Sequence, residues 1–450
     1  MRILQFSTLD RGGGAGRVAY DLHRAYQECG HDARMLVRRK FTADKNIMEI
    51  DPYAYTSAWG PVCARLEKKI RAFPKFSGQD RLVEWLRIAA WPRRWRDEWR
   101  GLEDFNYPYA THLLKENNWR PDLIHAHNLH GKYFDLRALA HLSRQIPVVW
   151  TLHDAWALTG HCSHFAHLGC ERWRSGCGNC PDLGCHLAIR RDRSADNWER
   201  KRRIYAASRL AVATPSRWLM SYVEQSMLTP WGNRVIPNGV DLTIFKPGDR
   251  WEVRQQLKLP SEAVICMFIA PSGSNPHPYK DYIMVERAVS RVFKKVPDTN
   301  LVFVCIGDNK IFSDNGRSYY TGRLDDPKQV SLYYQATDIL LHGANVDTSP
   351  LTVIEALACG TPVIASAVGG ISELIIEGEN GYLVPRGDSE LMARRIDELL
   401  GKPDLLQRLR RNALEQRNRF SLDHQVDAYL EWFEELRDLH YMDNNSQKNL

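Results

Sequence analysis

Short apolar runs alternate with helical patterns along most of this chain of 450 residues. The runs ILQF, LIHAH, VVWTLH and AVATP make a first series, and VICMFIA, LVFVCIG, DILLHG, PVIAS and GYLV make a second. Short apolar strands that alternate with helices are typical of parallel sheets covered by helices on both faces. The pattern therefore predicts an α/β protein with two doubly wound domains.

The segment VIPNGVDLTIFKP separates the two series and is rich in Pro, Gly and Asn, as a hinge should be. We predict an N-terminal domain over residues 1–215 and a C-terminal domain over residues 235–420. Residues 421–440 begin with Ser421, a suitable helix cap, and carry an aromatic stripe, so we expect a helix that packs back across both domains. Residues 441–450 are predicted to be a disordered tail.

The first residues, Met1 and Arg2, lead directly into a strand-like run, without the pattern of a signal peptide. No uninterrupted apolar stretch has the length needed to span a bilayer. We therefore expect a cytoplasmic protein.

The segment DTSPLTVIEALACGTPVIASAVGG, which begins at Asp347, combines two acidic residues with a helix start. Pro350 precedes an apolar pattern, so a helix is predicted from Leu351, and its first N–H groups lack partners inside the helix. Such a helix start favours a phosphate group. Glu355, about one turn further along, could accept hydrogen bonds from ribose hydroxyls, and Asp347 could bind sugar hydroxyls. The segment therefore predicts a nucleotide-sugar site.

This segment resembles the donor-site motif of retaining family-4 glycosyltransferases (glycosyl transferases group 1) of the GT-B fold, which has two glutamates separated by seven residues. Asp347 takes the place of the first glutamate, and Thr348-Ser349-Pro350-Leu351 takes the place of Gly-Phe-Pro-Leu. VIPNGVDLTIFKP resembles the opening of the family's second domain, and Ala336-Thr337-Asp338 resembles another of its segments. The resemblance covers most of the chain and implies two Rossmann-like domains of parallel sheets, facing a deep cleft.

The resemblance implies that a glycosyl group, of the hexosyl type, moves from a nucleotide-diphosphate sugar to a saccharide hydroxyl with retention of configuration. No metal or other cofactor is implied for catalysis, and the leaving phosphate is thought to help deprotonate the acceptor. The expected role is in exopolysaccharide or other cell-surface polysaccharide biosynthesis. By the same resemblance, the catalytic residues are His127, Lys280 and Asp347. The donor-binding residues are Gly13, Gly14, Gly16, Lys280, Asp347, Ser349, Pro350, Leu351, Thr352 and Glu355.

The loop after the first strand reads DRGGGAGRVAYDLH. Glycines let the backbone approach a ligand closely, and a helix that starts near Gly16 would direct its amide end at that ligand. A tight turn without a ligand is the alternative. The spacing does not satisfy Gly-x-Gly-x-x-Gly, because Ala15 and Arg17 stand where glycine is needed, which argues against a nicotinamide-dependent oxidoreductase.

His125 and His127 stand at the end of the run PDLIHAHN. We expect their side chains to face opposite ways, so that only one of them faces the site. The resemblance matches His127 to the second histidine of the family's His-x-His, a residue important for catalysis. The next strand ends in TLHDAW, where His153 and Asp154 are predicted to lie on the acceptor side. A purely structural histidine is the alternative.

Lys280, in HPYKDY, takes the position of the family's lysine that neutralises the donor diphosphate. A cation there would stabilise the charge that develops as the nucleotide leaves. The arginine that usually precedes it in the family is absent from FIAPSGSNPHPYK. Diphosphate stabilisation therefore depends on Lys280, on the helix start near Leu351, or on another cation.

Five of the ten cysteines crowd into residues 162–185, inside a Cys-rich insertion predicted at 160–186. Cys177 and Cys180 form a Cys-x-x-Cys pair, and Cys162 and Cys170 could complete a structural zinc site of four thiolates. Reduced thiols and disulfides are the alternatives. The substitute ligands are Cys185, His161, His164 and His186. Bacterial exopolysaccharide glycosyltransferases of the colanic-acid type contain a similar insertion.

A second insertion, at residues 64–100, carries eleven Lys or Arg against five Asp or Glu, with Phe and Trp interleaved. Such a segment suits the surface of an anionic membrane. We expect peripheral contact with the cytoplasmic face of the inner membrane and an acceptor linked to polyprenyl diphosphate. The alternative is a solvated pair of helices whose Trp side chains pack on the domain. No base-reading motif accompanies the basic residues, so no nucleic-acid partner is expected.

Two other classes of protein share this architecture. A catalytically silent GT-B protein that serves as a binding or scaffold partner would carry every fold signal, and the Asp347 substitution and the missing arginine keep this alternative open. A sugar-nucleotide epimerase would form a new sugar nucleotide without any acceptor.

Overall fold

The computed structural model describes residues 1–54, 58–112, 119–165, 168–270, 279–295, 300–307 and 317–448, with side chains up to residue 442. Backbone contacts divide the chain into two compact units. Unit 1 comprises Met1–Thr214, Met220–Val235 and Ala428–Leu450, and unit 2 comprises Pro215–Leu219 and Ile236–Asp427. The predicted domain limits at residues 215 and 235 lie next to these divisions.

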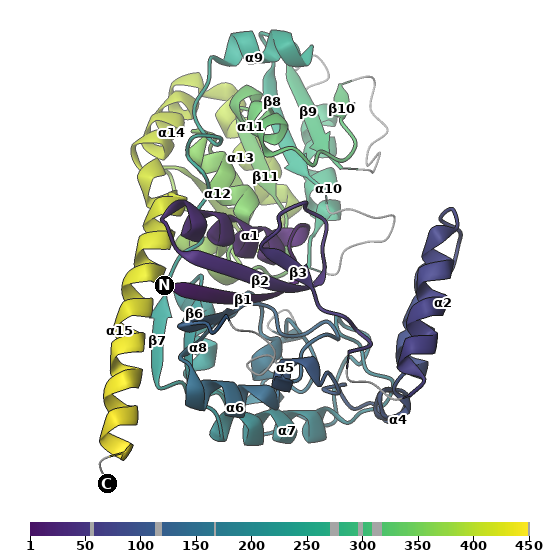
Figure 1. Cartoon of the computed structure of the whole chain (residues 1–450). Helices are drawn as coiled ribbons and strands as arrows, with labels where there is room; N and C mark the ends of the chain where they lie inside the picture. Colours follow the sequence, from purple (N-terminus) through teal and green to yellow (C-terminus); the bar gives the residue numbers. More distant parts are fainter. Residues whose placement is uncertain are drawn as a thin grey trace. The chain divides into compact units, whose positions relative to one another are not determined.

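Unit 1 is built on a parallel sheet with, in the described part of the chain, seven strands in the order β3-β2-β1-β4-β5-β6-β7. The helices α1 and α6 lie on opposite sides of this sheet (Figure 1), because right-handed crossovers that lead in opposite directions place their helices on opposite faces. The strands are β1 (Arg2–Leu9), β2 (Asp32–Arg39), β3 (Ile47–Glu49), β4 (Leu123–Ala126), β5 (Val148–Thr151), β6 (Leu210–Thr214) and β7 (Gly232–Val235). The helices and 3-10 turns are α1 (Gly13–Glu28), α2 (Gly60–Ala72), α3 (Gln79–Ala89), α4 (Pro92–Arg100), α5 (Tyr109–His112), α6 (Ala138–Gln145), η1 (Trp156–Leu158), η3 (Arg172–Arg174), α7 (Ser194–Ala206) and α8 (Arg217–Val223), which spans the division between the units.

Unit 2 is built on a second parallel sheet, whose six strands within the described residues follow the order β10-β9-β8-β11-β12-β13. The strands are β8 (Val264–Ile269), β9 (Leu301–Ile306), β10 (Ser318–Tyr320), β11 (Ile339–His342), β12 (Val363–Ser366) and β13 (Gly381–Val384). The helices and 3-10 turns are α9 (Arg250–Leu257), α10 (Tyr282–Lys295), α11 (Pro327–Ala336), α12 (Leu351–Ala358), η4 (Gly369–Glu373), α13 (Ser389–Gly401), α14 (Pro403–Glu415), η5 (Arg417–Phe420) and the start of α15 (Leu422–Lys448).

Both faces of the unit 2 sheet are buried, which explains why its strands are apolar without a polar alternation. Along β8, Ile265 and Met267 face one hydrophobic core, whereas Cys266 and Phe268 face another. Alternate side chains of a strand point to opposite faces, so a strand covered on both sides must be apolar throughout. The two sheets and their cores confirm the predicted α/β class with two Rossmann-like parallel-sheet domains.

Each sheet has a point where the order of its strands reverses. In unit 1 the chain runs from β1 to β2 and β3 and then returns to β4 on the other side of β1. In unit 2 it runs from β8 to β9 and β10 and then returns to β11 on the other side of β8. Ligands of such sheets bind outside the carboxyl ends of the strands that flank this point. We therefore expect ligand sites at the loops after β1 and β4, and at the loop after β11.

The C-terminal helix α15 begins after Ser421, whose hydroxyl oxygen accepts a hydrogen bond from the N–H of Asp423 at 3.1 Å. Its first turns group with unit 2 and the remainder with unit 1. The helix continues to Lys448, through most of the segment 441–450 that was predicted to be a disordered tail. The tail contains neither Pro nor Gly, and nothing in its sequence ends a helix that is already formed.

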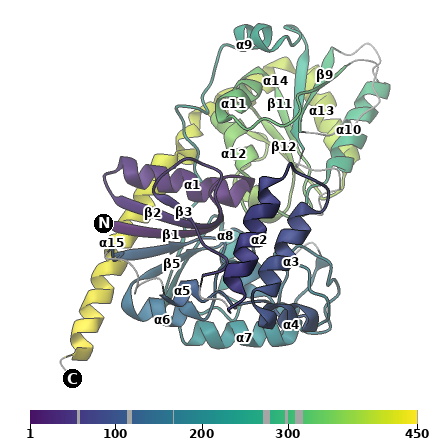
Figure 2. The same cartoon turned by 45° about the vertical axis from the view of Figure 1, so that its right-hand side comes forward.

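The basic insertion at 64–100 folds into most of α2 together with α3 and α4, a group of dark blue helices in unit 1 (Figure 2). The Cys-rich insertion at 160–186 holds little regular structure and follows an irregular path with η3 inside it. No helix in the described part of the chain combines the length and the apolar character needed to cross a bilayer.

Candidate functional site

A cluster of polar side chains lies in unit 2, beside the carboxyl end of β11. Lys280 reaches it because its backbone pairs with Ala344 in an isolated bridge. The Lys280 ammonium donates to Asp347 Oδ2 at 2.6 Å and lies 3.4 Å from His342 Nε2. The other ring nitrogen of His342 lies 3.3 Å from the hydroxyl of Thr352. Two predicted site residues, Lys280 and Asp347, are thus brought into direct contact.

His342 is the last residue of β11 and is almost fully buried. Burial, followed by the positive charge of Lys280, lowers the pKa of His342 to about 3. The imidazole is therefore neutral at physiological pH, and Lys280 supplies the positive charge of the cluster. His342 was not among the predicted site residues, although a histidine at the end of a predicted strand, five residues before Asp347, was an available signal.

The start of α12 carries polar atoms without partners. Pro350 is the N-cap residue and its side chain cannot bind the free N–H groups of the first turn. The hydroxyl of Ser349 and the amide oxygen of Asn238 are buried, and neither has a hydrogen-bond partner among the described residues. The amide nitrogen of Asn238 donates to the Ser349 carbonyl at 3.2 Å, so both unpaired atoms lie in one place. A buried polar atom without a partner costs free energy, and a ligand that binds it removes this cost.

Two glycines hold the loop after β12 against the segment that carries Asp347. A Cβ atom at Gly369 would lie 1.9 Å from the carbonyl oxygen of Asp347, and one at Gly370 would lie 1.9 Å from the carbonyl oxygen of Thr348. The N–H of Gly370 donates to the Asp347 carbonyl at 3.0 Å. Glycine is therefore needed at positions 369 and 370 for a close backbone contact that fixes the position of Asp347.

Glu355 lies inside α12 and is only 2% exposed. Its Oε2 atom accepts a hydrogen bond from the hydroxyl of Tyr334, on α11, at 2.8 Å. Tyr334 is itself fully buried. The protein itself therefore binds one oxygen of Glu355. Tyr334, like His342, was not among the predicted site residues.

The glycine-rich loop of unit 1 leads into α1, which begins at Gly13 rather than near Gly16. Gly12 and Gly13 adopt φ values of 103° and 67°, a left-handed conformation that side chains other than glycine rarely accept. A Cβ atom at Gly16 would meet the Leu9 carbonyl oxygen at 3.3 Å. Gly14 shows no such restriction. The glycines therefore make a tight turn, and α1 packs closely on β1.

Two of the predicted histidines meet in unit 1. His127 Nδ1 lies 3.0 Å from His153 Nε2, and the two rings stack with centroids 5.3 Å apart. The amide nitrogen of Gln5 lies 3.3 Å from His127 Nε2. An amide NH₂ group can only donate, so this contact favours the tautomer in which His127 carries its proton on Nδ1 and donates it to His153. Burial lowers the pKa of His127 well below its usual value and that of His153 to about 4, so both rings are neutral at physiological pH.

The expectation that His125 and His127 face opposite ways is wrong. Their ring centroids lie 4.2 Å apart, on the same side of the sheet. Residues two positions apart in a strand point to the same face, so the spacing itself required this result. His125 is fully buried and contacts the hydroxyls of Tyr26 at 3.2 Å and Thr151 at 2.8 Å. It supports the histidine pair from the core.

Asp154 accepts a hydrogen bond from His130 Nε2 at 2.9 Å. Burial would raise the pKa of Asp154, yet the charge and hydrogen bond of His130 hold it below the usual range. Asp154 is therefore ionised, and it fixes the ring of His130 on the loop after β4.

The four thiols that were predicted to bind zinc line one small cavity, and they belong to Cys162, Cys170, Cys177 and Cys180. All ten cysteines are free, so the disulfide alternative is not formed. Among the described residues, no group of three or more His, Cys, Asp or Glu side chains is arranged to hold a metal ion. Two of the sulfurs have other contacts: the N–H of Gly160 donates to Cys177 Sγ at 3.3 Å, and His161 Nε2 lies 3.3 Å from Cys180 Sγ. The zinc site stays a prediction.

Two family models match the chain. Residues 12–244 match the model of Glycosyltransferase Family 4, and residues 249–416 match the model of glycosyl transferases group 1. The chain belongs to glycosyltransferase family 4. The family match confirms the resemblance that the segment from Asp347 carried, and it identifies the chain as a glycosyltransferase.

Two curated relatives show how far this likeness extends. The chain is 24% identical over 453 residues to a protein of Escherichia coli (strain K12) named as a colanic acid biosynthesis glycosyl transferase, WcaC, with 97% of this chain and 100% of that protein covered. It is 31% identical over 327 residues to D-inositol 3-phosphate glycosyltransferase 1 of Catenulispora acidiphila, with 69% of this chain and 71% of that protein covered.

Solved structures of similar fold include the sucrose-phosphate synthase of Thermosynechococcus elongatus, with a TM-score of 0.63 at 19% identity over 96% of this chain and 98% of that chain. Anabaena HepE in complex with UDP-glucose has a TM-score of 0.61 at 16% identity over 96% of this chain and 99% of that chain. These likenesses, together with the two parallel sheets, show the GT-B fold.

Proposed function

We propose that this glycosyltransferase moves a hexosyl group from a nucleotide-diphosphate sugar to a saccharide acceptor, with retention of configuration and without a metal ion. The observation that carries the proposal is the start of α12, where Lys280 and the unpaired polar atoms of Ser349 and Asn238 lie within one site. The donor's diphosphate would bind the free N–H groups of α12 and the Lys280 ammonium. Asp347 would bind the sugar, and Glu355 would bind the ribose.

Lys280 is the main electrostatic element of this proposal. A diphosphate leaving group gains negative charge as its bond to the sugar breaks, and a cation fixed beside it stabilises that charge. The ion pair with Asp347 holds the ammonium in place before the donor binds. The neutral His342 adds no competing charge. The arginine missing from residues 269–279 would belong to a stretch that lies mostly outside the described residues.

The histidine pair of unit 1 would serve the acceptor. His127 donates to His153, and both are neutral, so neither holds a charge that a saccharide would have to displace. We propose that His127 positions the reacting groups and that His153 and Asp154 belong to the acceptor side. We also propose that the donor phosphates bind near Gly13, Gly14 and Gly16.

The biological role that we propose is the assembly of exopolysaccharide or another cell-surface polysaccharide on a lipid-linked acceptor. The full-length likeness to the colanic acid enzyme supports this role. The nucleotide sugar bound by Anabaena HepE supports a donor of the same chemical class.

We further propose that unit 1 makes peripheral contact with an anionic membrane surface through α2. Val62 and Leu66, one turn apart on α2, and Phe73, the residue after its end, are 43%, 44% and 66% exposed. The cations Arg65 and Lys69 are exposed beside them. Apolar side chains bordered by cations suit a lipid interface, where each cation near the surface contributes about 1 kcal/mol.

Vesicle flotation tests this contact. The double variant Leu66→Asp with Phe73→Asp should lose most of its binding to vesicles that contain phosphatidylglycerol, whereas Leu439→Asp, at an exposed leucine of α15, should keep it. Equal flotation of all three proteins would exclude α2 as the membrane contact.

A thermal-shift panel tests the donor site. The wild type, Lys280→Ala and Glu355→Ala would be heated with nucleotide sugars of each base and with free nucleoside diphosphates. One donor should stabilise the wild type, and both substitutions should abolish the shift. If no nucleotide shifts the wild type, the chain is the catalytically silent binding protein of the same fold.

A further inference from the structure

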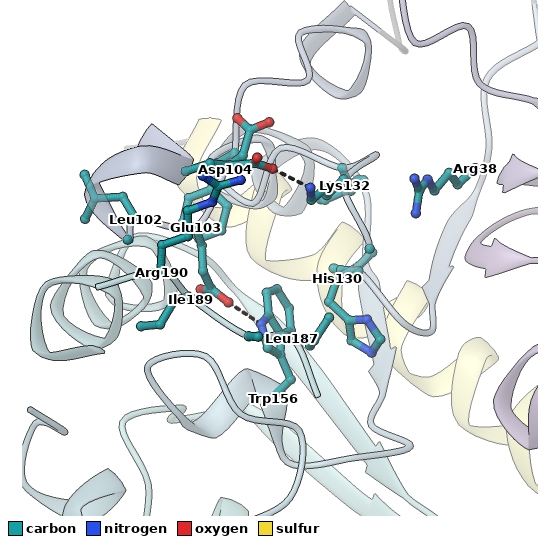
Figure 3. A pocket seen from close by; sticks show the side chains of 17 residues that line it. Arg38, Leu102, Glu103, Asp104, His130, Lys132, Trp156, Leu187, Ile189 and Arg190 are labelled. Carbon is teal, nitrogen blue, oxygen red and sulfur yellow. Dashed lines mark hydrogen bonds and ion pairs between the residues drawn. The ribbon is translucent and has the colours of Figure 1, made fainter. Parts of the chain in front are cut away.

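A cavity of about 380 Å³ opens in unit 1, outside the histidine pair (Figure 3). It is lined by the end of β2, by α4 and the loop after it, by the loop after β4, by η1, and by residues 187–190, which follow the Cys-rich insertion. Its floor therefore lies at the carboxyl end of the parallel strands, beside the point where their order reverses. Its volume falls within the usual range for small-molecule sites, about 300–1,000 Å³.

Residues that follow the two insertions build much of the wall of this cavity, at 101–105 and 187–190. Glu103, on the loop after α4, accepts a hydrogen bond from the indole of Trp156 (Figure 3). The same carboxylate pairs at 2.9 Å with Lys201, which is fully buried and also donates to the carbonyls of Trp156 and Thr159 at 3.0 Å. The Trp156 indole and the Lys201 ammonium thus hold the Glu103 carboxylate in position. A site whose polar atoms are already held in position loses little entropy when a ligand binds.

The charges on the lining balance one another. The three carboxylates each have a cation: Glu98 pairs with Lys132, Glu103 with Lys201, and Asp104 with Arg94. Arg38 pairs with Glu84, His130 pairs with Asp154, and Arg190 is exposed to solvent. Apolar side chains fill the remainder of the lining, at Phe105, Leu129, Phe134, Leu187 and Ile189. Fixed donors and acceptors without a net charge, set among apolar surface, match the hydroxyls and C–H faces of a neutral sugar.

A second cavity of about 180 Å³ continues from the first. The two share Glu98, Lys132 and Arg190, and the second adds the indole rings of Trp85 and Trp95. These rings are 54% and 47% exposed, so they offer large apolar surfaces to solvent. The ring of Trp99, which also lines the second cavity, stacks beside Trp95 with centroids 6.2 Å apart, which holds the wall rigid.

We propose that the two cavities form an oligosaccharide-binding groove, which takes a neutral acceptor of at least two sugar residues. The non-reducing end would lie in the larger cavity, because His130 and Trp156 line both that cavity and the surroundings of His127 and His153. The next sugar would lie against Trp95. The inference rests on the proposed function, since it specifies the acceptor of that reaction.

Saturation-transfer NMR with neutral saccharides tests the groove. The probes are the methyl glycosides of glucose, galactose and mannose, and the matching disaccharides. Ala188 is an exposed residue of the larger cavity's lining, and Ala188→Trp would fill that cavity without disturbing the core. Ala206→Trp, at an exposed alanine on α7, is the matched control. Trp95→Ala opens the smaller cavity.

At least one disaccharide should bind the wild type and Ala206→Trp, and should bind Ala188→Trp at least tenfold more weakly. It should also bind the wild type about fivefold or more tightly than its methyl glycoside, and Trp95→Ala should remove this advantage. The groove is overturned if no saccharide binds the wild type, if Ala188→Trp binds as the control does, or if the disaccharide has no advantage. Nucleoside diphosphates titrated into the same samples should bind all variants equally. Their failure to bind the wild type would overturn the proposed function, whatever the saccharides do.

Discussion

Replacing Lys280 by alanine should weaken nucleoside diphosphate binding by about 30- to 150-fold. Two unit charges about 4 Å apart attract one another by about 4 kcal/mol at an effective dielectric constant of about 20. The Lys280 side chain is 24% exposed, which allows some screening by solvent, so we expect a loss of about 2–3 kcal/mol. The loss includes repulsion, because Asp347 would then face the diphosphate without its cation.

Folding should suffer much less than binding. The ion pair of Lys280 and Asp347 is partly exposed, and such pairs contribute about 1 kcal/mol or less to stability. The melting temperature of Lys280→Ala should therefore fall by no more than about 2–4 °C. Lys295→Ala is the matched control, because Lys295 pairs with Asp397 at 2.7 Å elsewhere in unit 2.

Isothermal titration calorimetry with UDP, GDP and ADP measures the effect. The nucleotide that binds the wild type best should bind Lys280→Ala far more weakly and Lys295→Ala equally well. The double variant Lys280→Ala with Asp347→Asn should recover part of the affinity, since it removes the repelling carboxylate. Equal affinity of Lys280→Ala and the wild type would refute the electrostatic reasoning.

Three further changes test other parts of the account. Tyr334→Phe removes the hydroxyl that donates to the buried Glu355 and should lower the free energy of unfolding by about 1–3 kcal/mol in urea titrations; an unchanged value would contradict the role of this contact. Gly369→Ala places a Cβ atom 1.9 Å from the Asp347 carbonyl, at a φ of 60°, and should reduce both the melting temperature and nucleotide binding, whereas an unaffected protein would show that the close approach is not needed. The pKa of His153 is about 4 in the folded protein, below the unfolded value of about 6.5, so the unfolded chain binds the extra proton and stability should fall as the pH drops from about 6.5 towards 4. His153→Gln should reduce this slope by up to about 1.4 kcal/mol per pH unit in urea titrations between pH 7 and 5, and identical slopes would refute the assignment.

Much of the fold could be predicted because it follows from local pattern. Strands buried on both faces must be apolar, so runs such as LVFVCIG and PVIAS stand out from the polar helices around them. The start of α12 was also predictable, since Pro350 and the apolar residues after it determine where the helix begins. Both features depend on short stretches of sequence.

Contacts between distant residues could not be predicted in this way. Tyr334 meets Glu355 because α11 packs against α12, and no motif joins the two residues. His342 lies close to Lys280 because the backbone of Lys280 pairs with Ala344, two residues after the end of β11. A single sequence does not specify which side chains of separate elements converge.

The insertions show a second limit. Their composition indicated basic and aromatic character, yet Trp95 and Trp99 line a cavity while Phe73 is exposed just after α2, and only packing separates these two environments. In the Cys-rich insertion, the spacing of the thiols suggested zinc, and the fold brings four of them to one cavity, although no metal-binding arrangement is present among the described residues. Spacing along a chain does not determine the mutual geometry of side chains in an irregular segment.

The most direct test of the central claim is the turnover of nucleotide sugars by the purified protein, followed by NMR of the product. Incubation of a panel of UDP-, GDP- and ADP-hexoses with a lipid-linked saccharide extract should release one nucleoside diphosphate, in the presence of EDTA as in its absence. The new glycosidic bond should have the anomeric configuration of the donor sugar, and Lys280→Ala should slow its formation by about 100- to 1,000-fold. Release of no nucleoside diphosphate from any donor, or a product of inverted configuration, would contradict the account.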